Sequence, residues 1–318
     1  MVRIGSSDLD VLPLVLGGNV FGWTADEVSS YAVLDRFVEA GIGMVDTADA
    51  YSAWAPGNRG GESEEVLGRW IASRGARDRI VLATKVAKHP QRPGLSAANI
   101  RAACEDSLRR LQTDVIDLYY AHADDPAVPV EETLGGFDAL VREGKVRYVA
   151  ASNFPAERLA ESLAASDRDG LARYIALQQH YNLVHRKEYE GPLRDVVAVN
   201  GLASLPYYGL ASGFLTGKYR PGTSPTSDRA TRPERYSELM KGASAPDGGS
   251  RVLDGLDQVA GGRPLATIAL AWLLAQPTVT APIASARTVE QLPDLLAAMT
   301  TVLTVDELAA LDDASLTG

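Results

Sequence analysis

The sequence has a single cysteine, Cys104, in a chain of 318 residues. One cysteine excludes an internal disulfide and a cluster of thiolates around a metal ion. Cys104 lies at helical spacing from Ile100, Leu108 and Leu111, a pattern typical of a buried and unreactive thiol. Histidine is also scarce, with four residues, and their spacing is not that of a zinc site.

Positive charge is in short supply, with 31 Lys and Arg residues against 41 Asp and Glu residues and a net charge of −10. This balance argues against a nucleic-acid partner, because phosphates bind to basic surfaces. Residues 1–20 lack the basic and apolar segments of a signal peptide. The longest apolar run, Leu265–Ala275, is far too short to span a bilayer. We therefore expect a cytoplasmic protein that binds neither a membrane nor a nucleic acid.

Short apolar runs alternate with helical periodicity along most of the chain. After a predicted hairpin in residues 2–12, eight runs have the length and composition of strands. Strands that are apolar on both faces and joined by helical crossovers predict an α/β fold, namely a closed parallel (β/α)8 barrel, or TIM barrel. We expect this barrel to form a single domain over residues 1–318. The predicted strands are residues 14–16, 42–46, 80–85, 115–122, 146–153, 174–182, 202–207 and 279–284.

The predicted helices have recognisable starts and one long interruption. Capping boxes at Thr24–Glu27, Thr288–Gln291 and Thr304–Glu307 predict three helix N-termini. Residues 211–262, rich in Gly, Pro, Ser, Thr and Arg, predict a long loop after the seventh strand. The alternative fold is an open doubly wound sheet, which normally carries a Gly-x-Gly-x-x-Gly turn, and Gly17–Gly22 does not have that spacing.

Polar residues stand where several predicted strands end. Asp46 ends the second strand, Lys85 the third and His122 the fourth, and Tyr51 follows Asp46 by five residues. In a barrel, the C-terminal strand ends meet at one face and build the active site. Asp46 and Lys85 taken alone are equally compatible with a structural ion pair, and it is the joint occurrence that favours a catalytic site.

These residue types suit a proton transfer to oxygen. A free tyrosine titrates near ~10, and a neighbouring ammonium such as Lys85 would lower that pKa. Asp46 would hold the ammonium in place, and His122 can donate a hydrogen bond to a substrate oxygen. Such a site protonates an oxygen on which negative charge develops, as in the reduction of a carbonyl by hydride. Tyr207, at the end of the seventh strand, offers a ring for a nicotinamide to stack on.

Further short motifs accompany these strand ends, and together they are highly specific. With them the chain resembles the aldo-keto reductase family, in particular its bacterial NADPH-dependent members, over essentially its whole length. The resemblance implies a barrel enzyme that reduces an aldehyde or ketone to the alcohol with NADPH and no metal. The motifs are Asp46-Thr-Ala-Asp-Ala-Tyr51, Ala83-Thr-Lys85, Asp117-Leu-Tyr-Tyr-Ala-His122, Ser152-Asn-Phe, Gln178 with Tyr181-Asn182, Leu215-Thr-Gly-Lys-Tyr219 and Ala286-Arg-Thr-Val-Glu-Gln-Leu292.

The resemblance also implies residue roles. It makes Asp46, Tyr51, Lys85 and His122 the catalytic tetrad, with Tyr51 as the general acid. Arg287 would bind a 2′-phosphate, since a planar guanidinium suits that group. The sequence departs from the family pattern at Leu295, where an Asn near the adenine is common, and at Ala284-Ser285, where Pro-Gly is common. The implied cofactor contacts are Ser152, Asn153, Gln178, Tyr207, Leu210, Lys218, Ser285, Arg287 and Gln291.

Substrate-binding residues are expected in the loops after the first three strands. Trp23 and Trp54 are the predicted contacts, with Phe21 as a further candidate and Asn19, Asn58 and Arg59 as polar neighbours. Aromatic faces suit either a sugar-like or an aryl carbonyl, and packing at the rim is the alternative role for these rings. The alternative function is that of a regulatory subunit of the potassium-channel β type, which binds NADPH with little turnover. The sequence leaves the oligomeric state and the physiological substrate open.

Overall fold

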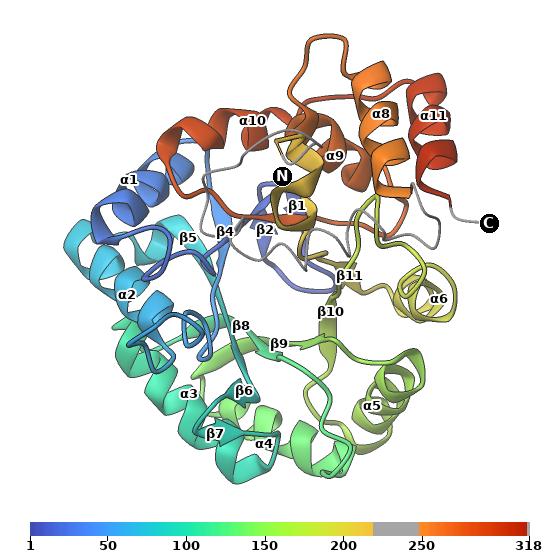
Figure 1. Ribbon diagram of the computed structural model, residues 1–318. Coiled ribbons are helices and arrows are strands. Elements are labelled where there is room, and N and C mark those ends of the chain that lie inside the picture. Colours follow the sequence, from blue (N-terminus) through green and yellow to red (C-terminus); the bar gives the residue numbers. More distant parts are fainter. Residues whose placement is uncertain (219–247, 317–318) are drawn as a thin grey trace.

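The computed structural model describes residues 1–218 and 248–316. At its centre a parallel eight-stranded sheet curls into a barrel that confirms the predicted fold (Figure 1). The Thr280 N–H donates to the Ser204 carbonyl at 2.9 Å and the Ile283 N–H to the Pro206 carbonyl at 2.8 Å, which closes the barrel. In chain order the strands are β3 (Val15–Gly17), β4 (Gly43–Asp46), β5 (Ile80–Val86), β8 (Ile116–Ala121), β9 (Val146–Ser152), β10 (Tyr174–Gln178), β11 (Ala203–Ser204) and β12 (Ile283–Ala284).

Helices form an outer ring around these strands (Figure 1). One of them, α8, lies inside the segment predicted to be a loop after the seventh strand, so part of that prediction is wrong. Residues 219–247 of the same segment lie outside the described residues. The helices are α1 (Glu27–Val38), α2 (Glu62–Arg74), α3 (Ala97–Leu111), α4 (Val130–Arg142), α5 (Ala156–Asp169), α6 (Pro192–Val199), α8 (Gly248–Ala260), α9 (Leu265–Leu274), α10 (Leu292–Ala297) and α11 (Val305–Ser315).

The strands are buried on both faces because each face packs on a different core. The outer core joins the strands to the helices and includes Trp70, Phe137 and Trp272. Cys104 belongs to it, and burial raises the pKa of its thiol to about 12, as expected of an unreactive cysteine. The inner core fills the barrel itself, for example with Leu118 of β8. Burial of these side chains is the main force that holds the barrel together.

The predicted N-terminal hairpin is present as β1 (Val2–Arg3) and β2 (Asp10–Val11). Ile4 and Leu9 extend the inner core, so the hairpin covers the end of the barrel opposite to the C-terminal strand ends. Gly5 lies against β10 with φ +52°, and a Cβ there would stand 2.2 Å from the Ile175 carbonyl oxygen. Glycine is required at this turn for both reasons.

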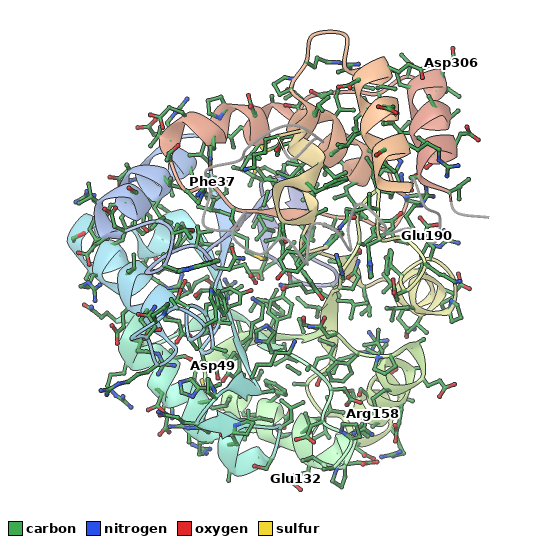
Figure 2. All side chains as sticks on the ribbon, in the orientation of Figure 1. Phe37, Asp49, Glu132, Arg158, Glu190 and Asp306 are labelled. Carbon is green, nitrogen blue, oxygen red and sulfur yellow. The ribbon has the colours of Figure 1, made fainter. Side chains whose placement is uncertain are left out.

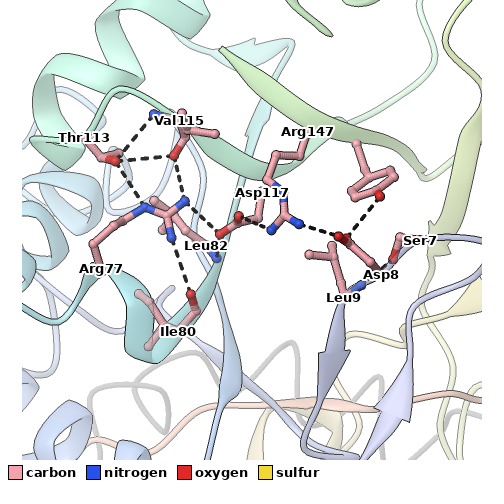
Figure 3. A network of polar contacts seen from close by, with 11 residues as sticks. Ser7, Asp8, Leu9, Arg77, Ile80, Leu82, Thr113, Val115, Asp117 and Arg147 are labelled. Atoms are coloured by element: carbon pink, nitrogen blue, oxygen red, sulfur yellow. Dashed lines mark hydrogen bonds and ion pairs between the residues drawn. The ribbon is translucent and has the colours of Figure 1, made fainter. Parts of the chain in front are cut away.

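A polar network fastens the hairpin to the barrel (Figure 3). The Asp117 carboxylate, near the start of β8, accepts from Arg147 at 2.9 Å and pairs with Arg77 at 2.8 Å. Arg147 also donates to Asp8 of the hairpin at 2.8 Å, and Tyr148 donates to the same oxygen at 3.1 Å. The charged groups of this network therefore have structural partners.

Two of the three predicted capping boxes are wrong. Helix α1 begins after Asp26, whose side chain accepts from the Ser29 N–H at 2.8 Å, so Thr24 is not its cap. Thr288 precedes a short 3-10 helix, Val289–Gln291, and makes no side-chain cap bond. Only Thr304 forms the predicted reciprocal box, with Glu307 at the start of α11. A capping motif in the sequence is therefore not decisive, because a neighbouring polar side chain such as Asp26 can accept the same backbone hydrogen bonds.

Several predicted boundaries differ from the observed ones. The seventh and eighth strands are paired over two residues each, because Pro206 and Pro282 have no N–H to donate. β10 ends at Gln178, four residues earlier than predicted, and α6 begins at Pro192, where proline fits the first turn. The loop after β5 contains a small hairpin of β6 (Lys88–His89) and β7 (Arg92–Pro93).

Candidate active site

The structure brings the predicted site residues together at the C-terminal ends of the strands. They surround one cavity of about 1210 Å³, with Lys85 as the exception, because it lies fully buried beneath the lining. The predicted residues that line the cavity are Trp23, Asp46, Tyr51, Trp54, His122, Ser152, Asn153, Gln178, Tyr207, Leu210, Lys218, Ser285, Arg287 and Gln291.

Asp46, Lys85 and Tyr51 form one hydrogen-bonded cluster. The Lys85 Nζ donates to Asp46 Oδ2 at 2.6 Å, to the Thr47 carbonyl at 2.8 Å and to the Tyr51 hydroxyl at 2.8 Å. The Tyr51 hydroxyl in turn donates to Asp46 Oδ2 at 3.2 Å. Asp46 ends β4 and Lys85 lies in the neighbouring β5, so the pairing of these two strands sets the distance between their side chains. The phenol therefore reaches the cavity with an ammonium group directly behind it.

The pKa of Tyr51 moves in the opposite direction to the sequence-based expectation. Burial, followed by the nearby Asp46 carboxylate, raises the pKa of Tyr51 well above its usual value. Burial also lowers the pKa of Lys85, although Asp46 opposes this change. Removal from water outweighs the attraction of the ammonium because both groups lie in a water-poor environment. In this state the phenol keeps its proton, as a proton donor must.

His122 follows β8 and is held by its backbone, whose N–H donates to the Val86 carbonyl at 2.8 Å. Burial, the Lys85 charge and the Lys88 charge lower the pKa of His122 well below its usual value. The imidazole is therefore neutral, with one N–H. Its ring lies 5.8 Å from the Tyr51 ring, centroid to centroid, in an edge-on arrangement. A substrate oxygen in the cavity can thus meet the phenol and the imidazole together.

The residues predicted to bind the nicotinamide already hold one another in place. Gln178 Nε2 donates to Asp46 Oδ1 at 2.9 Å, so this amide also fixes the catalytic cluster. Asn153, in the left-handed region at φ +56°, donates to the His122 carbonyl at 2.8 Å. Its Oδ1 accepts from the Tyr207 hydroxyl at 2.7 Å, and its Nδ2 donates to Ser152 Oγ at 2.9 Å. These bonds orient the Tyr207 ring along the cavity wall.

A column of stacked rings supports Tyr207 from behind, a feature the sequence analysis missed. The His180 ring lies 5.4 Å from the Tyr207 ring with an interplanar angle of 17°. His185 stacks on His180 at 3.6 Å and pairs with Glu188 at 2.6 Å. Their separate positions in the sequence gave no sign of this stacking, because His185 lies in a loop that folds back after β10.

The other end of the cavity carries cationic and polar groups. Arg287 and Lys218 line it, as predicted. Gln291 Oε1 accepts from the Arg287 N–H at 2.8 Å, so Gln291 fixes the backbone at Arg287 and does not reach back to Thr288 as predicted. Ser285 donates to Asn19 at 2.6 Å, which ties the segment after β12 to the one after β3.

Two tryptophans form the wall near the phenol. The Trp54 ring lies 5.6 Å from Trp23 and 6.0 Å from Tyr51, both in edge-on arrangements, and Trp54 is 43% exposed. Phe21 is wrong as a substrate contact, because it is fully buried in the outer core. The Asn58 side chain donates hydrogen bonds to the Gly22 and Ser52 carbonyls, so it stabilises the backbone of these loops.

Lys88 and Tyr208 also line the cavity, and the sequence analysis missed both. Lys88 lies three residues after Lys85 in the loop that follows β5. Its position just after a strand end could have identified it as a candidate site residue. Tyr208 adopts φ +55°, an unusual conformation for a tyrosine that no local pattern announces.

Asp49 is a buried carboxyl group close behind the cluster, in the loop after β4 (Figure 2). It is 2% exposed, and neither carboxyl oxygen has a hydrogen-bond partner among residues 1–218 and 248–316. Burial and the nearby Glu64 carboxylate raise the pKa of Asp49 to about 8. Glu64 is itself occupied, since it accepts from Thr84 at 2.5 Å and from Arg110 at 2.6 Å.

We expect Asp49 to make the protein less stable as the pH rises. The native state keeps this proton up to a pH of about 8, whereas the unfolded chain loses it near the ordinary pKa of 3.8. The unfolding free energy therefore falls with pH across that window, by an amount on the order of 2–5 kcal/mol. Asp49→Asn, which resembles the protonated acid, should be more stable than the parent at pH 8 and similar at pH 4. Urea unfolding at both pH values measures this.

The control for this experiment is Asp313→Asn on the exposed surface of α11. It should show no comparable gain at pH 8. An Asp49→Asn protein whose stability follows that of the parent at every pH would contradict the proton assigned to Asp49.

Within residues 1–218 and 248–316, no three His, Cys, Asp or Glu side chains come together in a way that could hold a metal ion. In the same part of the chain, no helix has both the length and the apolar character needed to cross a bilayer.

Comparison with known proteins identifies the family. The model of the aldo/keto reductase family matches residues 13–316. The uncharacterized oxidoreductase YrpG of Bacillus subtilis is 35% identical over 98% of this chain and 94% of its own length. Protein tas of Escherichia coli is 33% identical over 98% and 96% of the two chains. A probable voltage-gated potassium channel subunit beta of Oryza sativa is 31% identical over 93% and 90%.

The barrel and the match over nearly its whole length place this protein in one class, the (β/α)8 oxidoreductases. The chain belongs to the aldo/keto reductase family. Its relatives include named reductases, such as the aldo-keto reductase AMT2 of Alternaria alternata, which is 30% identical over 98% of this chain.

Proposed function

We propose that this protein reduces an aldehyde or ketone to the alcohol with NADPH, and that Tyr51 donates the proton. The observation that carries the proposal is the hydroxyl of Tyr51 at the cavity wall, 2.8 Å from the buried Lys85 Nζ. A phenol beside an ammonium can give up its proton to an oxygen that becomes negatively charged, because the ammonium stabilises the phenolate that remains.

The lining of the cavity fits a dinucleotide. It offers a flat ring at Tyr207 near the phenol, an apolar side chain at Leu210 and the cations Lys218 and Arg287 further along. NADPH bound there would supply the hydride. We infer that Ser152, Asn153 and Gln178 hold the carboxamide, that Ser285 lies along the cofactor, and that Arg287, with its backbone fixed by Gln291, binds the 2′-phosphate.

The residues of the chain then supply the proton and the orientation. His122 donates its N–H to the substrate oxygen and places it beside the Tyr51 hydroxyl. As hydride reaches the carbonyl carbon, the C–O double bond becomes single and the oxygen takes the Tyr51 proton. Lys85 stabilises the phenolate, and Asp46 keeps Lys85 charged. Trp23 and Trp54 hold the body of the substrate.

The test is a panel of aldehydes and ketones with NADPH, followed by the loss of the absorbance of the reduced nicotinamide. Turnover of several members, with the alcohol identified as the product, supports the proposal. Tight NADPH binding without turnover of any member would contradict it and would favour a regulatory subunit of the potassium-channel β type.

We expect Arg287→Ala to weaken NADPH binding by roughly ten- to a hundredfold and NADH binding much less. A charge-assisted contact to phosphate contributes on the order of 1.5–3 kcal/mol, and NADH has no 2′-phosphate. Fluorescence titration of the parent and the variant with each cofactor measures the difference. Glu290→Ala, which also changes a residue in the cavity lining, is the matched control and should not weaken NADPH selectively. Equal losses for both cofactors in Arg287→Ala would refute the phosphate role.

A further inference from the structure

Lys88 presents a positive charge to the reacting end of the cavity. It lies in β6, two residues after the end of β5, and lines the same cavity as Tyr51, Trp54 and His122. The hairpin that carries it is firmly anchored. The Gly94 N–H donates to the Ala87 carbonyl at 2.9 Å, and Asn99 of α3 donates to the Gly94 carbonyl at 2.7 Å. The position of Lys88 is therefore built into the fold.

The ammonium of Lys88 has no counter-ion among residues 1–218 and 248–316. The cations around it are paired: Lys85 with Asp46, Arg92 with Asp106 and Arg110 with Glu64. The Lys88 side chain itself forms no ion pair or hydrogen bond in this part of the chain, and it is exposed where it lines the cavity. Since Asp46 balances Lys85 and His122 is neutral, the charge of Lys88 is left uncompensated where the substrate must lie.

The field of Lys88 reaches the catalytic groups. Its charge contributes to the lowered pKa of His122 and to that of Lys85. Partial burial also lowers the pKa of Lys88. An ammonium that is partly removed from water and has no partner binds an anion more readily than a fully hydrated one. The protein as a whole carries a net charge of −10, so this local positive charge is not a general property of its surface.

We propose that Lys88 binds a carboxylate of the substrate, and hence that the enzyme prefers carbonyl compounds that carry a carboxylate, such as oxo acids and aldehyde acids. This inference rests on the proposed carbonyl reduction. A single ammonium with no second unpaired cation beside it in the described chain matches the single charge of a carboxylate. In the reaction the carbonyl carbon gains the hydride and its oxygen gains the Tyr51 proton, while the carboxylate is unchanged.

The test compares two substrates that differ in one charge, 4-formylbenzoate and its methyl ester, in the parent protein and in Lys88→Met. We expect the parent to prefer the carboxylate. Lys88→Met should lower kcat/KM for the carboxylate by roughly ten- to a hundredfold, mainly through KM, because a charged hydrogen bond contributes on the order of 1.5–3 kcal/mol. Its kcat/KM for the ester should stay within about twofold. Added salt should raise KM for the carboxylate alone.

Two further variants sharpen the result. Lys88→Arg keeps the charge and should retain most of the preference. Lys187→Met removes an exposed lysine that does not line the cavity, so kcat/KM should stay unchanged for both substrates. The same two ligands are also titrated into the NADP⁺ complex, with the fluorescence of the cavity tryptophans as the readout, which measures binding without turnover.

The outcomes separate the two proposals. Equal kcat/KM and equal binding for carboxylate and ester, or a Lys88→Met protein that keeps the preference, would overturn the role of Lys88 and leave carbonyl reduction standing. Binding that prefers the carboxylate in the parent and loses this preference in Lys88→Met, without reduction of any panel member, would overturn the reductase function and retain Lys88 as a carboxylate site.

Discussion

Tyr51→Phe is expected to lower kcat by a factor of about 10²–10⁴, the usual contribution of a positioned general acid. The variant removes one hydroxyl, which in the parent lies 2.8 Å from the Lys85 Nζ and 3.2 Å from Asp46 Oδ2. The ring stays, so its contacts with Trp54 and His122 are preserved. NADPH affinity should therefore change little. Single-turnover kinetics together with a cofactor titration measure both effects.

Tyr119→Phe is the matched control for this variant. Tyr119 is also fully buried, and its hydroxyl has no hydrogen-bond partner in the described structure. It packs edge-on against Phe137 in the outer core, 5.5 Å between ring centroids, and does not line the cavity. Its loss should leave kcat unchanged. Near-normal turnover by Tyr51→Phe would mean that another group donates the proton.

Asp46→Asn is expected to damage stability as well as catalysis. The Lys85 side chain is fully buried and Asp46 is its only carboxylate partner in the described chain, at 2.6 Å. Removing one member of a buried ion pair typically costs about 3–5 kcal/mol, because the remaining charge is left without compensation. Lys85 would then tend to lose its proton and could no longer stabilise the Tyr51 phenolate. Urea unfolding and kcat measurements should both show the loss.

The double variant Asp46→Asn with Lys85→Met separates these two effects. Removing both charges leaves no uncompensated ion in the barrel, so much of the stability should return. Activity should not return, because the phenol no longer has an ammonium beside it. If Asp46→Asn unfolds at the same urea concentration as the parent, the pair is not the buried, mutually dependent unit that we infer.

The sequence alone determined the barrel and the location of its site. Two-sided apolar strands and helical crossovers are local patterns, and a parallel barrel must bring its C-terminal strand ends to one face. Asp46, Lys85 and His122 could therefore be placed at this face from their positions at the ends of apolar runs. The cavity residues at the far end, such as Arg287, came from the family resemblance.

The tertiary structure decided which partner each side chain has. Gln178 reaches Asp46 across 132 residues, and no local pattern encodes such a contact. The Tyr51 pKa was misjudged for the same reason: the sequence shows which charges are near, but burial depends on the packing of the whole chain. Within the described chain, the carboxyl of Asp49 and the ammonium of Lys88 have no partner. This could not be read from the sequence, because the lack of a partner depends on the three-dimensional surroundings.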